Sequence, residues 1–160
     1  LEINGREIVG GIPESTETRY NSSPAANSVT ENESPVTERM TFEGRIFRSV
    51  SNSSSGDVDA ETLFHYHQIG EDLVWATYEG GSVRFGTLVA RVLADASLDM
   101  RYQHVNRSGE LMTGVCRSRP EVLPDGRLRL HESWRWTCGD RSAGRSVVEE
   151  VMEVPDESAT

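Results

Sequence analysis

The sequence predicts an all-β protein in which about eight antiparallel strands, joined by sequential hairpins, close into an up-and-down barrel. The stretch RLRLHESWRWT at residues 127–137 alternates between apolar and polar side chains, the period of a strand with one buried face. From residue 40 onward, similar short runs are separated by Gly, Asn and Asp turns, without any long helical periodicity. A closed barrel is favoured over an open sheet because closure leaves no unpaired edge strand.

The expected strands follow one another at hairpin spacing. Pro124-Asp125-Gly126 is the strongest turn signal and leads directly into the stretch at 127–137. Gly86, inside an expected strand, is predicted to mark a bulge. The expected strands are Met40–Val50, Thr62–Ile69, Asp72–Tyr78, Ser82–Leu93, Leu98–Val105, Glu110–Arg119, Arg127–Thr137 and Ser146–Val154.

Residues 40–154 are therefore expected to form one barrel domain, with segments of different composition on either side. Residues 13–38 are rich in Ser, Thr, Asn, Glu and Pro, so residues 1–39 are expected to be a flexible N-terminal extension. The alternative is a lid, because five apolar side chains in this extension are enough to close the mouth of a pocket. Residues 155–160, which begin with a proline, are expected to be a disordered tail.

Charge and composition exclude several classes of partner. The net charge of −10 argues against nucleic acid and against an anionic membrane surface, both of which need basic residues. The chain contains no lysine, which excludes a Schiff-base or P-loop lysine. No apolar run approaches the roughly 18 residues of a membrane helix and no signal peptide is visible, so a cytoplasmic location is expected.

The two cysteines are expected to be free thiols, in keeping with a reducing compartment. Cys116 and Cys138 fall on neighbouring strands but several residues out of register. At about 3.3 Å per residue, this offset exceeds the reach of a disulfide.

The segments TLFHYHQ, LDMRYQHVN, GELMTG, LHESWRWTCGD and VVEEV resemble a family of small bacterial proteins of uncertain function. Its members often carry the label "N-acetylglutamate synthase". The resemblance covers about residues 40–154 and leaves the N-terminal extension unmatched. It supports a barrel, which by its hairpin order is calycin-like, and it assigns no site residue.

Glu132 breaks the alternation of residues 127–137, because it lies on the apolar face between Leu130 and Trp134. A carboxylate on a buried face costs several kcal/mol unless it is paired, hydrogen-bonded or neutralised. One interpretation is a structural ion pair with Arg117 on the preceding strand. The other is a functional Glu132, acting as a general acid or base.

The inward face of the predicted barrel supplies a candidate pocket. An interior with aromatic and a few polar side chains suits one small ligand, although such side chains can also be plain core. The candidate catalytic residues are Glu132, Tyr102, His104 and Tyr66. The candidate substrate-binding residues are Trp134, Trp136, Phe64, Gln68, Tyr78 and Met100.

His65-Tyr66-His67 followed by Glu71 resembles the first metal motif of cupins, HxH and then Glu. Two histidines at i and i+2 share one strand face, as chelation requires. However, Phe64 and Tyr66 are expected to point inward, which turns both histidines outward. No metal ligands and no cofactor are therefore predicted.

The leading hypothesis is a cofactor-free cyclase or isomerase that folds an extended hydrophobic natural-product intermediate inside the barrel. Orientation of a flexible substrate can contribute ~7–11 kcal/mol to such a reaction. The alternatives are a lipocalin-like carrier, a cupin-like metal-binding protein, and a barrel filled solid by its own side chains. A hydrophobic small molecule is the expected partner, and a homodimer stays open.

Overall fold

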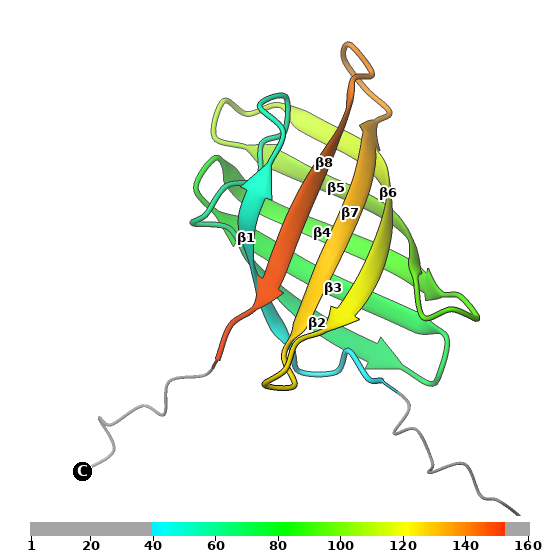
Figure 1. Cartoon of the computed structure of the whole chain (residues 1–160). Helices are drawn as coiled ribbons and strands as arrows, with labels where there is room; N and C mark the ends of the chain where they lie inside the picture. The colour runs from blue at the N-terminus through cyan, green and yellow to red at the C-terminus, as the bar shows by residue number, and fades with distance from the viewer. Residues whose placement is uncertain (1–39, 153–160) are drawn as a thin grey trace, which may run out of the picture. The chain divides into compact units, whose positions relative to one another are not determined.

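The computed structural model describes residues 40–152, which form a closed barrel of eight antiparallel strands, as predicted (Figure 1). Each strand pairs with the next one in sequence, and the last pairs with the first. The expected N-terminal extension, its alternative as a lid, and the tail lie outside the described residues. The strands are β1 (Ile46–Asn52), β2 (Leu63–Ile69), β3 (Leu73–Gly80), β4 (Val83–Val92), β5 (Leu98–Asn106), β6 (Leu111–Val122), β7 (Leu128–Trp136) and β8 (Ala143–Glu150).

The first strand begins at Ile46 instead of Met40, because the preceding residues cross one end of the barrel and close it. The Phe42 side chain is fully buried there, and its backbone N–H donates to Gln68 Oε1 at 2.8 Å. Arg45 then joins this segment to β8, since its guanidinium lies 2.6 Å from Glu150 Oε2. We call this end of the barrel, closed by residues 40–45, the plugged end.

Gly86 borders a bulge and does not lie in it. β4 pairs irregularly with β3 between Val83 and Gly86, and with β5 between Val83 and Phe85. Gly86 itself pairs in register with Tyr78 on β3, and a methyl group on Gly86 would overlap the Tyr78 ring. The glycine is therefore needed for the close approach of a side chain and not for an irregular backbone.

Aliphatic and aromatic side chains fill the barrel at the plugged end. Burying each large apolar side chain contributes about 1.5–3 kcal/mol, so this half of the interior supplies much of the hydrophobic stabilisation. At the opposite end, which we call the open end, the loop of residues 53–62 between β1 and β2 covers the interior (Figure 1). The side chains that fill the plugged end include Phe42, Phe47, Val74, Leu98, Leu128, Leu130 and Val148, each at most 1% exposed.

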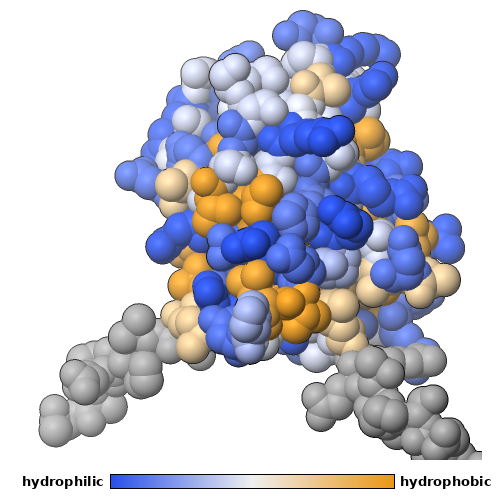
Figure 2. All heavy atoms as spheres, in the orientation of Figure 1, coloured by the Kyte–Doolittle hydropathy of each residue, from blue (hydrophilic) through white to orange (hydrophobic). Residues whose placement is uncertain are grey.

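The outer face of the barrel is mostly polar, as the alternation in the strands predicts. Figure 2 shows mainly hydrophilic side chains on one side of the molecule, with hydrophobic groups between them. Some outward side chains are apolar, such as Phe85 and Val89, which are about half exposed, and Val89 lies beside Trp75 of β3. Within residues 40–152 there is no helix long and apolar enough to cross a bilayer.

Both cysteines are free, which confirms the prediction. Cys116 pairs in register with Trp134 on β7, whereas Cys138 lies beyond the end of that strand. The offset in register is what separates the two thiols.

Candidate functional site

A cavity of about 50 Å³ opens between the packed core and the loop of residues 53–62. Eight of the ten predicted site residues line it: Glu132, Tyr102, His104, Trp134, Trp136, Phe64, Tyr78 and Met100. The other lining residues are Asn52, Gly56, Asp57, Val58, Leu88, Cys116 and Ser146. The structure thus brings most of the predicted residues to one place, while their binding of a ligand stays a prediction.

Glycines on neighbouring strands let the aromatic side chains lie against the barrel wall. Tyr102 pairs in register with Gly114, and Trp134 pairs with Gly144, just as Tyr78 pairs with Gly86. In all three pairs, a Cβ on the glycine would overlap the facing ring. An aromatic ring that lies over a glycine of the neighbouring strand covers the backbone that the glycine, having no side chain, leaves bare. Ring position, and with it the shape of the cavity, therefore depends on these three pairs.

Glu132 points inward from β7, as the break in alternation predicted. Its Oε1 accepts a hydrogen bond from Ser146 Oγ at 3.0 Å, and the Cys116 thiol approaches Oε2 at 3.9 Å. Burial raises the pKa of Glu132 to about 7, and these hydrogen bonds offset only part of that effect. The residue is enclosed by the barrel and still keeps some accessible surface, because it faces the cavity instead of packed atoms.

The predicted ion pair between Glu132 and Arg117 does not form. Arg117 pairs in register with Ser133, so its side chain lies on the outer face, where it is exposed. The residue opposite Glu132 on β6 is Ser118, which is fully buried and whose hydroxyl lacks a hydrogen-bond partner among the described residues. Successive residues of a strand point to opposite faces, so Arg117 faces outward when Ser118 faces inward beside Glu132.

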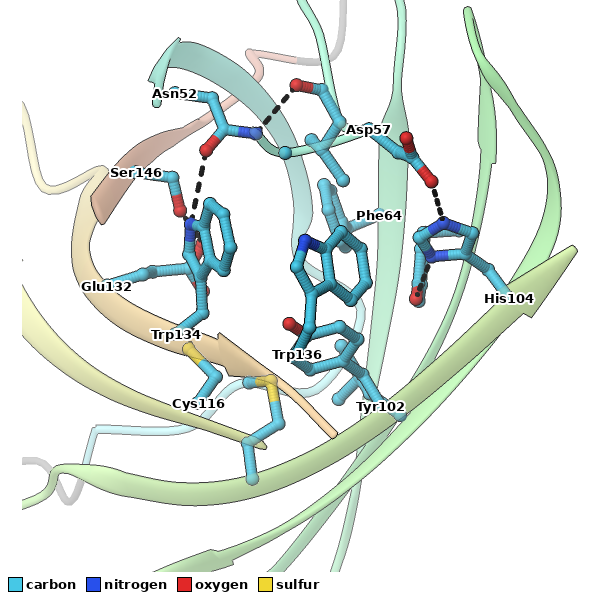
Figure 3. Close-up of a pocket in the computed structure, with 15 residues that line it drawn as sticks. Asn52, Asp57, Phe64, Tyr102, His104, Cys116, Glu132, Trp134, Trp136 and Ser146 are labelled. Atoms are coloured by element: carbon cyan, nitrogen blue, oxygen red, sulfur yellow. Dashed lines mark hydrogen bonds and ion pairs between the residues drawn. The ribbon is translucent and has the colours of Figure 1, made fainter. Parts of the chain in front are cut away.

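A second polar group lies across the cavity from Glu132. His104 Nε2 is 2.9 Å from Asp57 Oδ2, and His104 Nδ1 is 2.9 Å from the Tyr78 hydroxyl. In the tautomer in which Nε2–H donates to the Asp57 carboxylate, Nδ1 accepts from the Tyr78 hydroxyl, so the three groups form one hydrogen-bonded series. Figure 3 shows His104 and Asp57 on one side of the two tryptophans, and Glu132 with Ser146 on the other side.

The tryptophans also hold the loop that covers the open end. Trp134 Nε1 donates to Asn52 Oδ1 at 3.1 Å, and Trp136 Nε1 donates to the Ser55 carbonyl at 3.0 Å. Asn52 in turn donates through Nδ2 to the Val58 carbonyl at 2.8 Å. With both indole N–H groups satisfied, the tryptophans offer the cavity mainly their apolar rings.

Tyr66 and Gln68, two of the predicted site residues, lie away from the cavity. Tyr66 points inward but is packed between Phe42 and Phe47, with ring centroids 6.3 and 4.8 Å away. Gln68 lies at the plugged end, where its Nε2 donates to the Gly70 carbonyl at 3.1 Å. Both follow the inward alternation of β2, but that strand runs from the open end toward the plugged end, so its later residues leave the cavity behind.

The histidine pair of the cupin-like motif lies on the outer face. His67 stacks on Trp75 with centroids 4.2 Å apart, and its Nδ1 is 3.6 Å from Glu43 Oε1. Across residues 40–152, the structure brings no three His, Cys, Asp or Glu side chains together in a way that could hold a metal ion.

Several lining residues carry no signal in the sequence. Asp57 is one carboxylate in a polar loop, and nothing local distinguishes it from Asp59. Ser146 lies just inside an expected strand, but a serine there reads equally well as an outward residue. Cys116 could have been assigned to the cavity by register with Trp134 once the hairpin at Gly126 was fixed.

The chemistry open to this site follows from its contents. Burial raises the pKa of the Cys116 thiol, and the neighbouring Glu132 raises it further, so this group is a weak donor and not a nucleophile. Burial likewise raises the pKa of the Tyr78 and Tyr102 hydroxyls, which remain protonated donors at neutral pH. Glu132 can exchange a proton near neutrality, and the aromatic rings can pack against a ligand.

Comparison with known proteins agrees with this architecture. No curated protein and no solved structure matched the chain. The comparisons lend no support to the label "N-acetylglutamate synthase". The model of a family described as avidin-like protein matches residues 40–151, almost the whole described barrel. A closed eight-stranded barrel of this kind is a ligand-binding fold, which agrees with a cavity at its open end. The chain therefore belongs to the avidin-like protein family.

Proposed function

We propose that this protein binds one small organic molecule in the cavity, between the aromatic rings and with a polar group of the ligand on Glu132. The observation that carries the proposal is a carboxyl group that faces enclosed space and whose polar neighbours, among the described residues, are the Ser146 and Ser118 hydroxyls and a thiol 3.9 Å away. A carboxylate offers about four acceptor positions. Acceptor capacity is thus left over for a ligand, in a barrel of a ligand-binding family.

The size of the cavity limits what enters it. About 10–15 Å³ is enough for one water molecule, so 50 Å³ accommodates a group of a few non-hydrogen atoms. An extended hydrophobic intermediate would need the loop of residues 53–62 to move. We therefore favour a small ligand, or a small head group of a larger one.

Native mass spectrometry of the full chain tests binding directly. The wild-type protein is expected to retain a small co-purifying molecule, or to take one up from a fragment library. Leu88→Phe adds a ring to the cavity wall and is expected to abolish retention. Val89→Phe, on the outer face of the same strand, is the matched control and should bind normally. If no compound binds the wild type, or if Leu88→Phe binds as well as Val89→Phe, the proposal is refuted.

Catalysis by a cofactor-free cyclase or isomerase is the second candidate, and the pKa of Glu132 favours it. A carboxyl group with a pKa of about 7 can both take up and release a proton at neutral pH, as general acid–base catalysis requires. Tyr102 and His104 would then orient the substrate. When a bound compound is incubated with the protein, an enzyme should convert it, and Glu132→Gln should lower the rate by about 10²–10⁴-fold. A carrier should return the compound unchanged.

A further inference from the structure

The charged groups around the cavity are of one sign. Its lining includes the two carboxylates of Asp57 and Glu132, and among the described residues it includes no arginine. Asp57 is already engaged by His104 at 2.9 Å. Glu132, by contrast, lies among uncharged groups, so its ionised form has no cationic partner among the described residues.

The walls of the cavity suit an organic cation. Trp134 and Trp136 have ring centroids 5.5 Å apart at an interplanar angle of 59°, and Tyr102 lies 5.8 Å from Trp136 at 65°. The Tyr102–Trp136 contact is edge to face, all three rings line the cavity, and a cation that reaches the face of an aromatic ring is attracted by it. Because the indole N–H groups are engaged by Asn52 and Ser55, the rings are held in place and present few donors that would attract an anion.

From this arrangement we propose that the ligand carries a small alkylated ammonium group, which the rings of Trp134, Trp136 and Tyr102 surround and Glu132 neutralises. The inference rests on the proposed small-molecule function and names its ligand class. A metal ion is a poor candidate because no three metal-ligating side chains come together among the described residues. The volume of about 50 Å³ suits a head group of a few atoms, such as a methylated ammonium.

The titratable side chains around Glu132 come from several strands. Tyr66 on β2 lies toward the plugged end, whereas Tyr78 on β3, Tyr102 on β5 and Cys116 on β6 line the cavity. Burial raises the pKa of each, so all stay neutral near pH 7. His104 with Asp57 lies across the cavity, and β8 contributes the uncharged Ser146. Burial raises the pKa of empty Glu132 to about 7, whereas a bound cation would favour its ionised form. Binding should therefore release a proton below neutral pH.

Isothermal titration calorimetry of the full chain at constant ionic strength tests the inference with three probes of one branched shape. They are choline, the uncharged alcohol in which carbon replaces the choline nitrogen, and the matching carboxylate. Choline is expected to bind about tenfold or more tightly than the alcohol, and the carboxylate should not bind measurably. Between about pH 8 and pH 5, the affinity for choline should fall by about two orders of magnitude.

At about pH 8, Glu132→Gln is expected to lose about two orders of magnitude or more in choline affinity, to lose the pH dependence, and to bind the alcohol as the wild type does. Glu121→Gln, at a carboxylate on the outer face, is the control and should change nothing.

If the alcohol binds as tightly as choline while Leu88→Phe blocks both, the ammonium class is refuted and the small-molecule function stands. If the mass spectra show a bound compound that is neutral or anionic, the same conclusion holds. If no probe and no library compound binds, both proposals fail. Should Glu132→Gln not fold, the ratio of choline to alcohol affinity in the wild type still decides whether the cavity prefers an ammonium group.

Discussion

Glu132 is a carboxyl group that the barrel encloses without a cationic partner among residues 40–152. Loss of hydration disfavours its charged form, and the Ser146 hydroxyl together with the Cys116 thiol compensates only in part. Such a group destabilises the empty protein at neutral pH, a cost that ligand binding can recover. The residue therefore links stability, pH and binding.

The stability of the ligand-free protein should depend on the protonation of Glu132. Its pKa is raised from 4.5 to about 7, so between these values the native state holds a proton that the unfolded chain has released. The free energy of unfolding should fall as pH rises through this window, by about 3 kcal/mol in total. Glu132→Gln cannot ionise and should lack this decrease. Urea unfolding at about pH 4 and about pH 8 gives the free energy of unfolding of both proteins. An equal change between the two pH values in the wild type and in Glu132→Gln would contradict the raised pKa of Glu132.

Sequence reasoning identified Glu132 because a buried carboxylate interrupts a regular pattern, and such an interruption is visible locally. It could not identify Asp57, whose role comes from a contact with His104 across 47 positions in sequence. It also placed Gln68 at the site, since alternation gives the face of a strand but not the depth along the barrel axis. The face of the strand to which a side chain points follows from the local sequence, whereas its distance from the cavity along the barrel axis follows only from the whole fold.

At the scale of elements, strand pairs shape the cavity through aromatic rings laid on glycines. Gly86→Ala on β4 would push the Tyr78 ring off the wall and strain its hydrogen bond to His104. Overpacking of this kind is expected to destabilise the protein by about 1–3 kcal/mol. Thr87→Ala, on the outer face of the same strand, should have little effect. Thermal unfolding of both variants measures this, and a Gly86→Ala protein as stable as the Thr87→Ala control would refute the role of the pair.

The loop of residues 53–62 should loosen when its link to β5 is removed. Asp57→Ala leaves the Nε2–H of buried His104 without a partner, which costs about 1–3 kcal/mol. Asp57→Asn keeps an oxygen acceptor and should lose less. Hydrogen exchange at residues 55–58 is expected to accelerate about tenfold or more in Asp57→Ala. Asp140→Ala, in the loop between β7 and β8, is the control. Unchanged exchange in Asp57→Ala would show that the tryptophan contacts alone hold the loop.

At the scale of the whole molecule, closure leaves the described barrel without an edge from which to unravel. A reagent larger than the cavity of about 50 Å³ should therefore reach the interior only when the loop of residues 53–62 moves or the barrel unfolds. Cys116 is 6% exposed, and burial raises its pKa, so a maleimide should label it slowly in the folded protein and faster as unfolding begins. Cys138, at the end of β7, should react sooner. Mass spectrometry of the labelled peptides across a urea series gives both rates, and labelling of Cys116 as fast as Cys138 without urea would contradict its enclosed position.

Most of the fold was predictable because hairpin barrels are encoded locally, by alternation within strands and by turn residues such as Asp125 and Gly126. The plug at residues 40–45 was not, since Phe42 is a single apolar residue in a polar run and becomes core only through a contact with β2. The size of the cavity was equally out of reach. It depends on how ring positions and facing glycines combine across six strands.

The described chain enters and leaves the barrel at the plugged end, where Phe47 pairs with Glu150 and the Val151 N–H donates to the Ile46 carbonyl. Joining these two points with a short linker and opening the chain at Asn106–Gly109 would give a circular permutant with every strand neighbour retained. Residue 40 and residue 152 would likewise serve as attachment points at the end of the barrel remote from the cavity.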